Sequence, residues 1–144
     1  MMTMKFEIRP FQPSDGTAVV QLWKDCNLVV PWNDPHRDIL RKLRVQPELF
    51  LAGFVSDELV AAIMAGYEGH RGWLNYLAVA QHFRRQGLGR KMVAEAEARL
   101  RGMGCPKINI QIRTGNTEVI EFYRRVGFKP DDVVSMGRRL ESDE

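Results

Sequence analysis

Residues 73–100, WLNYLAVAQHFRRQGLGRKMVAEAEARL, decide the fold, because an apolar run passes through a basic, glycine-containing turn directly into a helical pattern. Residues 73–79 are almost all apolar, which predicts a strand covered on both faces. After the turn, every fourth residue is apolar and predicts one buried helical stripe: Leu88, Met92, Ala96 and Leu100. The first N–H groups of a helix have no intrahelical partner and lie at the positive end of its dipole. This junction is therefore predicted to bind an anion, and its glycines would let a phosphate approach.

The turn from Arg84 to Gly89 has the form R-x-x-G-x-G. Its spacing excludes a dinucleotide fingerprint, which would need glycine at Met92, and a Walker loop, which needs four residues between its glycines and then Gly-Lys. Glycines at such a junction can also serve close packing alone, and the turn by itself leaves that reading open. The turn resembles the acyl-coenzyme A pyrophosphate loop of the GNAT superfamily of N-acetyltransferases.

Composition limits the other possibilities. The 144 residues predict a single domain, residues 1–144, and 44% hydrophobic with 27% charged residues is typical of a globular protein. The uncharged stretch 59–67 is too short to cross a bilayer and the N-terminus lacks an apolar signal core, so we expect a cytoplasmic protein without membrane contact. The net charge of +3 is modest, and no aromatic residues interleave the basic cluster as in nucleic-acid-binding proteins. Cys26 and Cys105 form no C-x-x-C pair, so we expect reduced, buried thiols and no metal site.

The remaining elements follow from periodicity and turn signals. The first helix is expected to start at Ser14 or Asp15 and to bury Ala18, Val19, Leu22, Trp23 and Cys26, and the second to be capped by Asp34, begin at Pro35 and bury Ile39, Leu40 and Leu43. In chain order the other predictions are an edge strand over 5–11, a hairpin of strands over 49–55 and 59–67, a strand over 107–113, a helix from Asn116 or Thr117 to Gly127, and a terminal strand from Phe128 that resumes over 133–140.

A second motif supports the resemblance. Residues 116–128, NTEVIEFYRRVGF, are similar to the late helix of the family, N-x-x-x-x-x-F-Y-x-x-x-G-F. The segments PWNDP, GYEGHRG and GCPKI resemble a small bacterial subgroup, the YpeA-type acetyltransferases, which are similar to ribosomal-protein N-terminal acetyltransferases. The resemblance implies a mixed α/β, GNAT-like fold: a mostly antiparallel central sheet of six or seven strands, flanked by about four helices, in the order β-α-α-β-β-β-α-β-α-β.

The resemblance also implies the reaction. Acetyl would move from acetyl-coenzyme A, as co-substrate, to a primary amine by direct attack in a ternary complex, without a metal. The acceptor could be a peptide N-terminus, a lysine or a small amine, possibly on a protein, and the enzyme could be a monomer or a homodimer. The residues expected to bind the cofactor are Leu77, Ala78, Val79, Arg84, Arg85, Gln86, Gly87, Leu88, Gly89, Arg90, Asn116 and Tyr123. Because the strand must offer its edge to the pantetheine arm, we expect a bulge or splay near 77–79.

Catalysis needs a base and an acid. An amine with a pKa of about 10.4 is mostly protonated at pH 7, a handicap of roughly 4.6 kcal/mol. Glu68 is the first candidate base, followed by Asp34 and His70, although Asp34 could be only a helix cap and the other two only solvated turn residues. Tyr123 matches the family position for the acid that protonates the departing thiolate, and a main-chain N–H near Val79 would meet the oxyanion.

The expected acceptor-binding residues are Trp32, Asn33, Asp34, Tyr67 and His70, and Trp32 could equally be a packing residue. A different class of function stays open: a coenzyme A-binding sensor or regulatory module that kept the cofactor turn without productive transfer. A basic nucleic-acid module ranks third.

Overall fold

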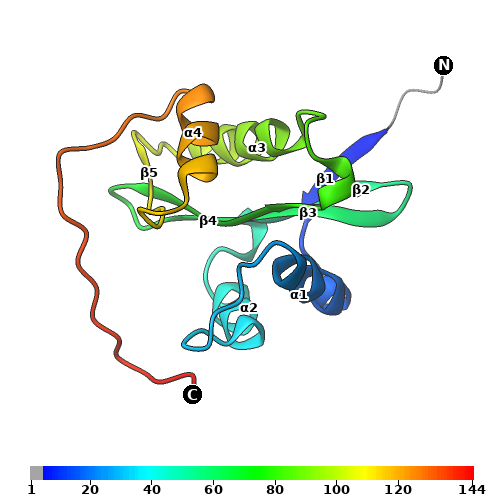
Figure 1. Cartoon of the computed structure of the whole chain (residues 1–144), viewed down its shortest axis with the longest axis horizontal. Coiled ribbons are helices and arrows are strands. Elements are labelled where there is room, and N and C mark those ends of the chain that lie inside the picture. The colour runs from blue at the N-terminus through cyan, green and yellow to red at the C-terminus, as the bar shows by residue number, and fades with distance from the viewer. Residues whose placement is uncertain (1–4) are drawn as a thin grey trace.

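A five-stranded sheet separates two pairs of helices in the computed structural model, which describes residues 5–144 (Figure 1). The strands, adjacent in chain order, are β1 (Phe6–Pro10), β2 (Phe50–Val55), β3 (Glu58–Tyr67), β4 (Gly72–Val79) and β5 (Ile108–Ile110). All neighbours pair antiparallel except β4 and β5, which are parallel. The helices are α1 (Gly16–Asp25), α2 (Pro35–Leu43), α3 (Leu88–Gly102) and α4 (Thr117–Arg125), with short 3-10 turns at Pro13–Asp15, Pro47–Leu49 and Gln81–Phe83.

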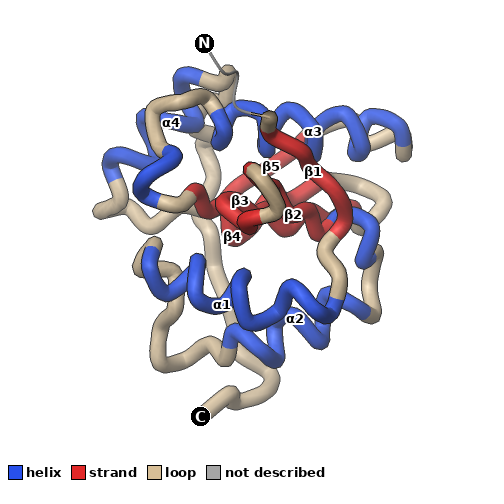
Figure 2. The backbone as a smooth tube through the Cα atoms, turned by 90° about the vertical axis from the view of Figure 1, so that its right-hand side faces the viewer, coloured by secondary structure: helices blue, strands red, loops and turns tan. Residues whose placement is uncertain are grey.

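The sheet is covered on both faces, with α1 and α2 on one side and α3 and α4 on the other (Figure 2). Alternation along β2 sends Leu51 into the cluster under α3 and Phe50 into the cluster under α1. The stripe predicted for α3 is fully buried: Leu88, Met92, Ala96 and Leu100 are each at most 2% exposed. The predicted mixed α/β architecture is therefore confirmed, and so is the order of elements through α4.

Two predictions about buried helix faces are wrong. On α1, Ala18 is exposed and Val20 is buried in its place, beside Val19 and Trp23. On α2, Leu40 is 60% exposed, and Ile39 is the buried residue. Periodicity gives the spacing of an apolar stripe, but the rotation of the helix depends on what it packs against.

The predicted terminal strand is also wrong, so the sheet has five strands instead of six or seven. Residues 128–144 form neither helix nor strand in the structure. Their contacts near β5 are made by side chains, such as the ion pair between Lys107 Nζ and Asp131 at 2.9 Å. Val134, within this segment, is 86% exposed. The strand predicted over 107–113 shrinks to the three residues of β5, which offer few ladder positions to a further strand. An alternating pattern can form a strand only when a neighbour supplies the hydrogen bonds.

Three further findings concern the described residues, 5–144. Their helices include none long and apolar enough to cross a membrane. Their His, Cys, Asp and Glu side chains form no group of three that could hold a metal ion. Cys26 and Cys105 are free thiols and half-buried, not buried as expected.

Candidate active site

The turn between β4 and α3 presents a run of free amides. Gly87 caps α3 with φ +79°, and Arg85 also has positive φ, at 63°. The first bond into the helix runs from Lys91 N–H to the Gly87 carbonyl, at 3.1 Å. Within the part of the chain that the structure describes, the N–H groups of residues 85–90 donate no hydrogen bond. Because they lie at the N-terminus of a 15-residue helix, they suit an anionic ligand.

The two glycines of the turn have different structural roles. A Cβ on Gly87 would meet nothing within 4 Å, so that side of the turn is open, whereas the positive φ disfavours other residues. A Cβ on Gly89 would lie 3.3 Å from the Phe122 ring of α4 and 3.7 Å from Val79 Cγ2. Gly89 thus serves close packing between α3, α4 and β4, and Gly87 serves the shape of the turn.

Arg84 ties this turn to the end of β4. Its Nε donates to the Val79 carbonyl at 3.1 Å, and its Nη2 lies 3.5 Å from Cys26 Sγ, which follows α1. Arg84 therefore supports the loop, while Arg85, Gln86 and Arg90 are exposed around the free amides.

The strand beside the turn is interrupted by a bulge. Ala62 pairs with Ala78 and Met64 with Asn75, so one residue of β3, Ile63, lies opposite two residues of β4, Tyr76 and Leu77. Tyr76 has φ 54°, in the left-handed region. The bulge, at Tyr76 and Leu77, therefore includes the first residue of the segment 77–79 near which it was expected.

The parallel pairing of β4 with β5 stops before this bulge. Its last pair is Leu74 with Ile110. Beyond it, the described part of β5 gives residues 77–79 no partner strand. A free strand edge therefore leads from the bulge to the amide turn.

Tyr123 lies in the core cluster under α3. It is 6% exposed, packs with Leu74, and meets the Phe122 and Phe128 rings edge to face at 5.1 and 5.3 Å. Burial raises the pKa of the phenol, so the hydroxyl stays protonated at neutral pH. Among the described residues, no group hydrogen-bonds to it.

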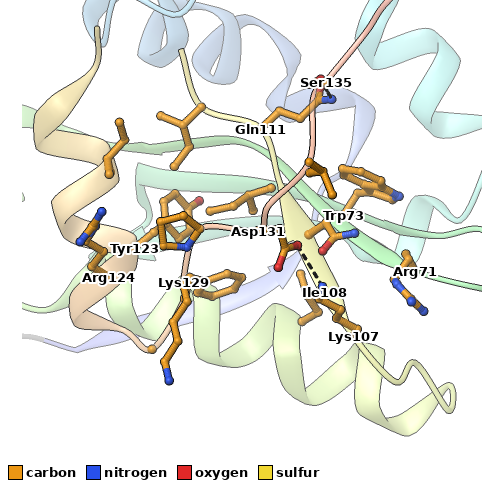
Figure 3. A pocket seen from close by; sticks show the side chains of 18 of the residues that line it. Arg71, Trp73, Lys107, Ile108, Gln111, Tyr123, Arg124, Lys129, Asp131 and Ser135 are labelled. Carbon is orange, nitrogen blue, oxygen red and sulfur yellow. Dashed lines mark hydrogen bonds and ion pairs between the residues drawn. The ribbon is translucent and has the colours of Figure 1, made fainter. Parts of the chain in front are cut away.

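A separate groove of about 1460 Å³ runs along β5 (Figure 3). Its walls come from the start of β4, the end of α3, β5 and the residues after it, α4 and the residues after α4, and they include Trp73, Gln111, Tyr123 and Ser135. Residues 77–79 and 84–90 do not line this groove. Tyr123 is the one residue of the expected cofactor-binding set among its lining residues. The groove lies along β5 because the last segment of the chain does not pair with this strand.

Glu68, Tyr67 and His70 gather in the turn between β3 and β4. The Glu68 carboxylate accepts hydrogen bonds from the N–H of Arg71, at 2.6 Å, and of His70. These two bonds, Arg71's first, hold the pKa of Glu68 below its ordinary value, which makes it a weaker base. The bulge residue Tyr76 follows Gly72 by four residues, about 13 Å along the strand. The structure thus places this turn at the opposite end of β4 from the bulge.

Trp32, Asn33 and Asp34 lie in the loop between α1 and α2. Asp34 caps α2 by accepting from the N–H of His36 and of Arg37, at 2.9 and 3.2 Å. Trp32 is 45% exposed, and the Arg113 guanidinium, just after β5, lies 5.1 Å from its ring centre. The expected acceptor residues therefore form two groups, one in this loop and one in the β3–β4 turn.

A polar network absent from the sequence-based predictions joins α2 to the bulge. The Tyr76 hydroxyl donates to Asp38 at 2.6 Å, and Arg41 donates to the same carboxylate group at 3.0 Å. The i,i+3 spacing of Asp38 and Arg41 is a local signal that could have indicated their pair. Tyr76 is 38 residues from Asp38 and carried no such signal.

Comparison with known proteins places this geometry in context. Residues 16–128 match a family model described as the acetyltransferase (GNAT) family. An acetyltransferase from Yersinia enterocolitica is 44% identical over 138 residues, 96% of this chain and 98% of that protein. In fold, the chain is similar to the ribosomal-protein-S18-alanine N-acetyltransferase from Escherichia coli, with a TM-score of 0.73, 20% identity, and coverage of 87% of this chain and 78% of that one. It is also similar to AAC(6')-Iy in complex with the bisubstrate analogue CoA-S-monomethyl-acetylneamine, with a TM-score of 0.76, 16% identity, and coverage of 94% and 98%.

Proposed function

This chain belongs to the GNAT family of acetyltransferases, and from that premise we propose that it moves acetyl from acetyl-coenzyme A to a primary amine by direct attack in a ternary complex. The observation that carries the proposal is the run of free N–H groups at residues 85–90, next to a strand edge that β5 leaves open after Leu74. A diphosphate fits the first and an amide-bearing arm fits the second. The similarity to AAC(6')-Iy, whose structure holds a coenzyme A-based analogue, agrees with this cofactor.

The proposed cofactor contacts divide by their place in the structure. The amides of residues 85–90 would bind the pyrophosphate, with the Arg85 and Arg90 side chains nearby as exposed cations. Residues 77–79 would pair with the pantetheine arm. Asn116, the residue just before α4, belongs to the same proposed set.

Tyr123 is the proposed acid. When the amine forms its C–N bond and the C–S bond breaks, the sulfur leaves as a thiolate that needs a proton. The ordinary pKa values of a thiol and a phenol, about 8.5 and 10, are close enough for transfer. Burial raises the phenol's pKa, and the same apolar surroundings would raise the proton affinity of a thiolate beside it, so the two stay matched.

The structure gives less support for any one residue as the general base than for Tyr123 as the acid. Glu68 remains the candidate from the sequence, but its carboxylate already accepts two main-chain hydrogen bonds and lies in the turn distant from the bulge. Asp34 and His70 remain the alternatives, and Asp34 is engaged as the cap of α2. An amine delivered in its neutral form into apolar surroundings would need less help from any of the three.

The acceptor is proposed to bind between the α1–α2 loop and β4, in contact with Trp32, Asn33 and Asp34, with Tyr67 and His70 farther along the strand. The fold neighbour from Escherichia coli acts, by its name, on the alanine of ribosomal protein S18. A peptide N-terminus is therefore one acceptor class to test, together with lysine and small amines.

Two measurements test the proposal. Acetyl-coenzyme A at 100 times its Kd should raise the free energy of unfolding by about 2.7 kcal/mol, seen as a higher melting temperature. Exchanging Arg85 and Arg90 for glutamine should reduce this shift, whereas Arg101→Gln, at the far end of α3, is the matched control. No shift at millimolar cofactor would contradict the proposal.

Thiol release in the presence of an amine panel then measures transfer. Turnover with any primary amine supports the enzyme, and binding without turnover across peptides, lysine and polyamines would favour the sensor that the sequence left open.

A further inference from the structure

The end of the chain lies beside α2 (Figure 1), where it contacts a site formed by the Asp34 N–H before the helix and the side chains of Arg37 and Arg41 along it. The Asp143 carboxylate accepts two hydrogen bonds from the Arg41 guanidinium, at 2.6 and 3.2 Å, and one from the Asp34 N–H at 2.8 Å. Arg37 Nη1 lies 3.8 Å away. As a result, the Asp143 side chain is 0% exposed, although it is the second-last residue of the chain.

Apolar packing does not hold this segment. Val134, Met136 and Leu140 are 86%, 90% and 92% exposed. The contacts that bring residues 139–143 to the α1–α2 side are polar: Arg139 donates to Asn33, and Asp143 binds Arg41 and the Asp34 N–H. The site therefore recognises a carboxylate and not an apolar strand.

The site also touches the proposed acceptor region. Arg41 donates to Asp38, which accepts from the Tyr76 hydroxyl in the bulge of β4. The Asp34 N–H, which binds Asp143, belongs to the loop proposed to contact the acceptor. A carboxylate in this site is thus linked by two hydrogen-bonded side chains to the place where β4 and β5 part.

The charges around the site fit an amine that also carries a carboxylate. Arg37 pairs with Asp34 at 3.7 Å and Arg41 with Asp38 at 3.0 Å. Arg41 presents a forked pair of N–H donors to the acid group, and Arg37 lies 3.8 Å from it. The two aspartates beside them attract an ammonium. With two arginines and two aspartates the local charges nearly cancel, so the carboxylate is bound through directed hydrogen bonds and not through a net positive charge.

We propose that Arg41, Arg37 and the Asp34 N–H form a carboxylate-binding subsite for the acceptor, and that Asp143 occupies this subsite as an internal competitor in the free protein. The acceptor class is then an amine with an acidic group close by, such as a peptide with Asp or Glu near its N-terminus. This inference rests on the proposed function, since an acceptor exists only if the protein transfers acetyl to amines.

The first test measures binding without turnover, in the full-length protein. The probe is a fluorescent peptide with the sequence of residues 137–144, GRRLESDE, and its counterpart GRRLESNE. Asp143→Asn should empty the subsite. The acidic peptide should then bind to this variant about tenfold more tightly than it binds to the unsubstituted protein, and also about tenfold more tightly than GRRLESNE binds to the variant. Adding Arg41→Gln should abolish the gain, and adding Arg44→Gln, an exposed arginine one position after α2, should keep it.

Equal binding of both peptides to the Asp143→Asn variant would overturn the proposal and leave Asp143 as a structural anchor. If Arg41→Gln lowers the melting temperature, Arg41→Lys replaces it: the lysine keeps the charge but cannot form the forked contact, so part of the gain should be lost.

The second test measures transfer, using Ala-Glu-amide and Ala-Gln-amide as acceptors. Asp143→Asn should lower the KM for the acidic acceptor severalfold and leave the KM for the neutral one unchanged. An equal change for both would count against the subsite. If neither peptide nor any other amine releases thiol, the proposed function fails, and the binding test still decides whether the carboxylate site exists.

Discussion

At Gly87 the backbone takes a φ of +79°, where an L side chain is strained. We expect Gly87→Ala to lower the free energy of unfolding by about 1–2 kcal/mol and to weaken acetyl-coenzyme A binding, because the turn that carries the free amides would shift. Urea unfolding and titration calorimetry measure the two effects. Gly102→Ala is the control: Gly102 ends α3, has open space around its Cβ and lacks positive φ, so this change should be neutral or stabilise by about 0.5–1 kcal/mol. Equal losses in both variants would count against a special role for Gly87.

The ring of Tyr123 packs in the core, and its hydroxyl is the proposed acid, so a change to phenylalanine removes the second role and keeps the first. Tyr123→Phe should reduce kcat about 100-fold, at the low end of the range for acid catalysis. The fold should persist, because the ring contacts with Phe122 and Phe128 remain and the hydroxyl has no hydrogen-bond partner to lose among residues 5–144. The cofactor-dependent rise in melting temperature should also remain. Tyr67→Phe removes a hydroxyl that donates to the Gly69 carbonyl. Because Tyr67 belongs to the proposed acceptor-binding set, its change should appear in the KM for the acceptor and leave kcat almost unchanged.

For Glu68 the structure points to a smaller effect than the sequence did. Its two main-chain hydrogen bonds lower its pKa and occupy its carboxylate, so we expect Glu68→Gln to keep at least about half of kcat. The measurement is initial-rate kinetics with saturating acceptor between pH 6 and 9. A loss near 100-fold, with unchanged cofactor binding, would restore Glu68 as the base.

Between elements, the start of α1 is fastened to β1 by one carboxylate. Asp15 accepts from Arg9 at 2.8 and 3.0 Å and from the Gln12 N–H at 2.9 Å. Burial alone would raise the pKa of Asp15, but the bonds from Arg9 and Gln12 outweigh it and the pKa is lowered. This ion pair sets where the chain turns from the edge strand into the helix.

Asp15→Asn should therefore lower the free energy of unfolding by about 1.5–3 kcal/mol at pH 7. A carboxylate whose pKa is lowered on folding stabilises above its unfolded pKa of about 3.9, and this contribution disappears as pH falls through the lower folded value. The difference between variant and parent should thus shrink below pH 4, as measured by urea unfolding at pH 7 and pH 3. Asp25→Asn, at the exposed end of α1, should show little change at either pH. A difference that stays constant with pH would contradict this account.

Across the whole molecule, the last segment leaves α4 on one side of the sheet and ends beside α2 on the other (Figure 1). Within residues 129–144, no backbone group hydrogen-bonds to another backbone group, and the anchor at Asp143 is polar. Few contacts hold this segment, so it should detach locally from the rest of the protein far more easily than the sheet unfolds.

Limited trypsin digestion should therefore cleave after Arg138 or Arg139 before it cleaves after Arg99 or Arg101 in α3, leaving a core with the sheet intact. Mass spectrometry of timed samples identifies the products. Arg41→Gln should speed the first cleavage by loosening the anchor, with Arg44→Gln as the control. Simultaneous cleavage in α3 would show that the segment is held as firmly as the sheet.

Most of the fold could be predicted from patterns of residues close together in the sequence. The stripe of α3, the Asp34 cap before Pro35 and the β2–β3 hairpin depend on residues within one or two turns of each other, so their spacing was sufficient. The two motifs, residues 84–89 and 116–128, led to the family, which the comparisons confirmed.

The sequence by itself thus determined the family, the order of elements through α4 and the place of the amide turn, since each is a short-range property of the chain. Only the tertiary structure decided that residues 133–140 form no strand, that Leu40 faces solvent, and that Tyr76 donates a hydrogen bond to Asp38. Asp143 and Arg41 are 102 residues apart, and neither residue's neighbours indicate the contact. The physical reason is that a strand or a carboxylate satisfies its hydrogen bonds with whatever the fold brings beside it, and periodicity does not record that neighbour.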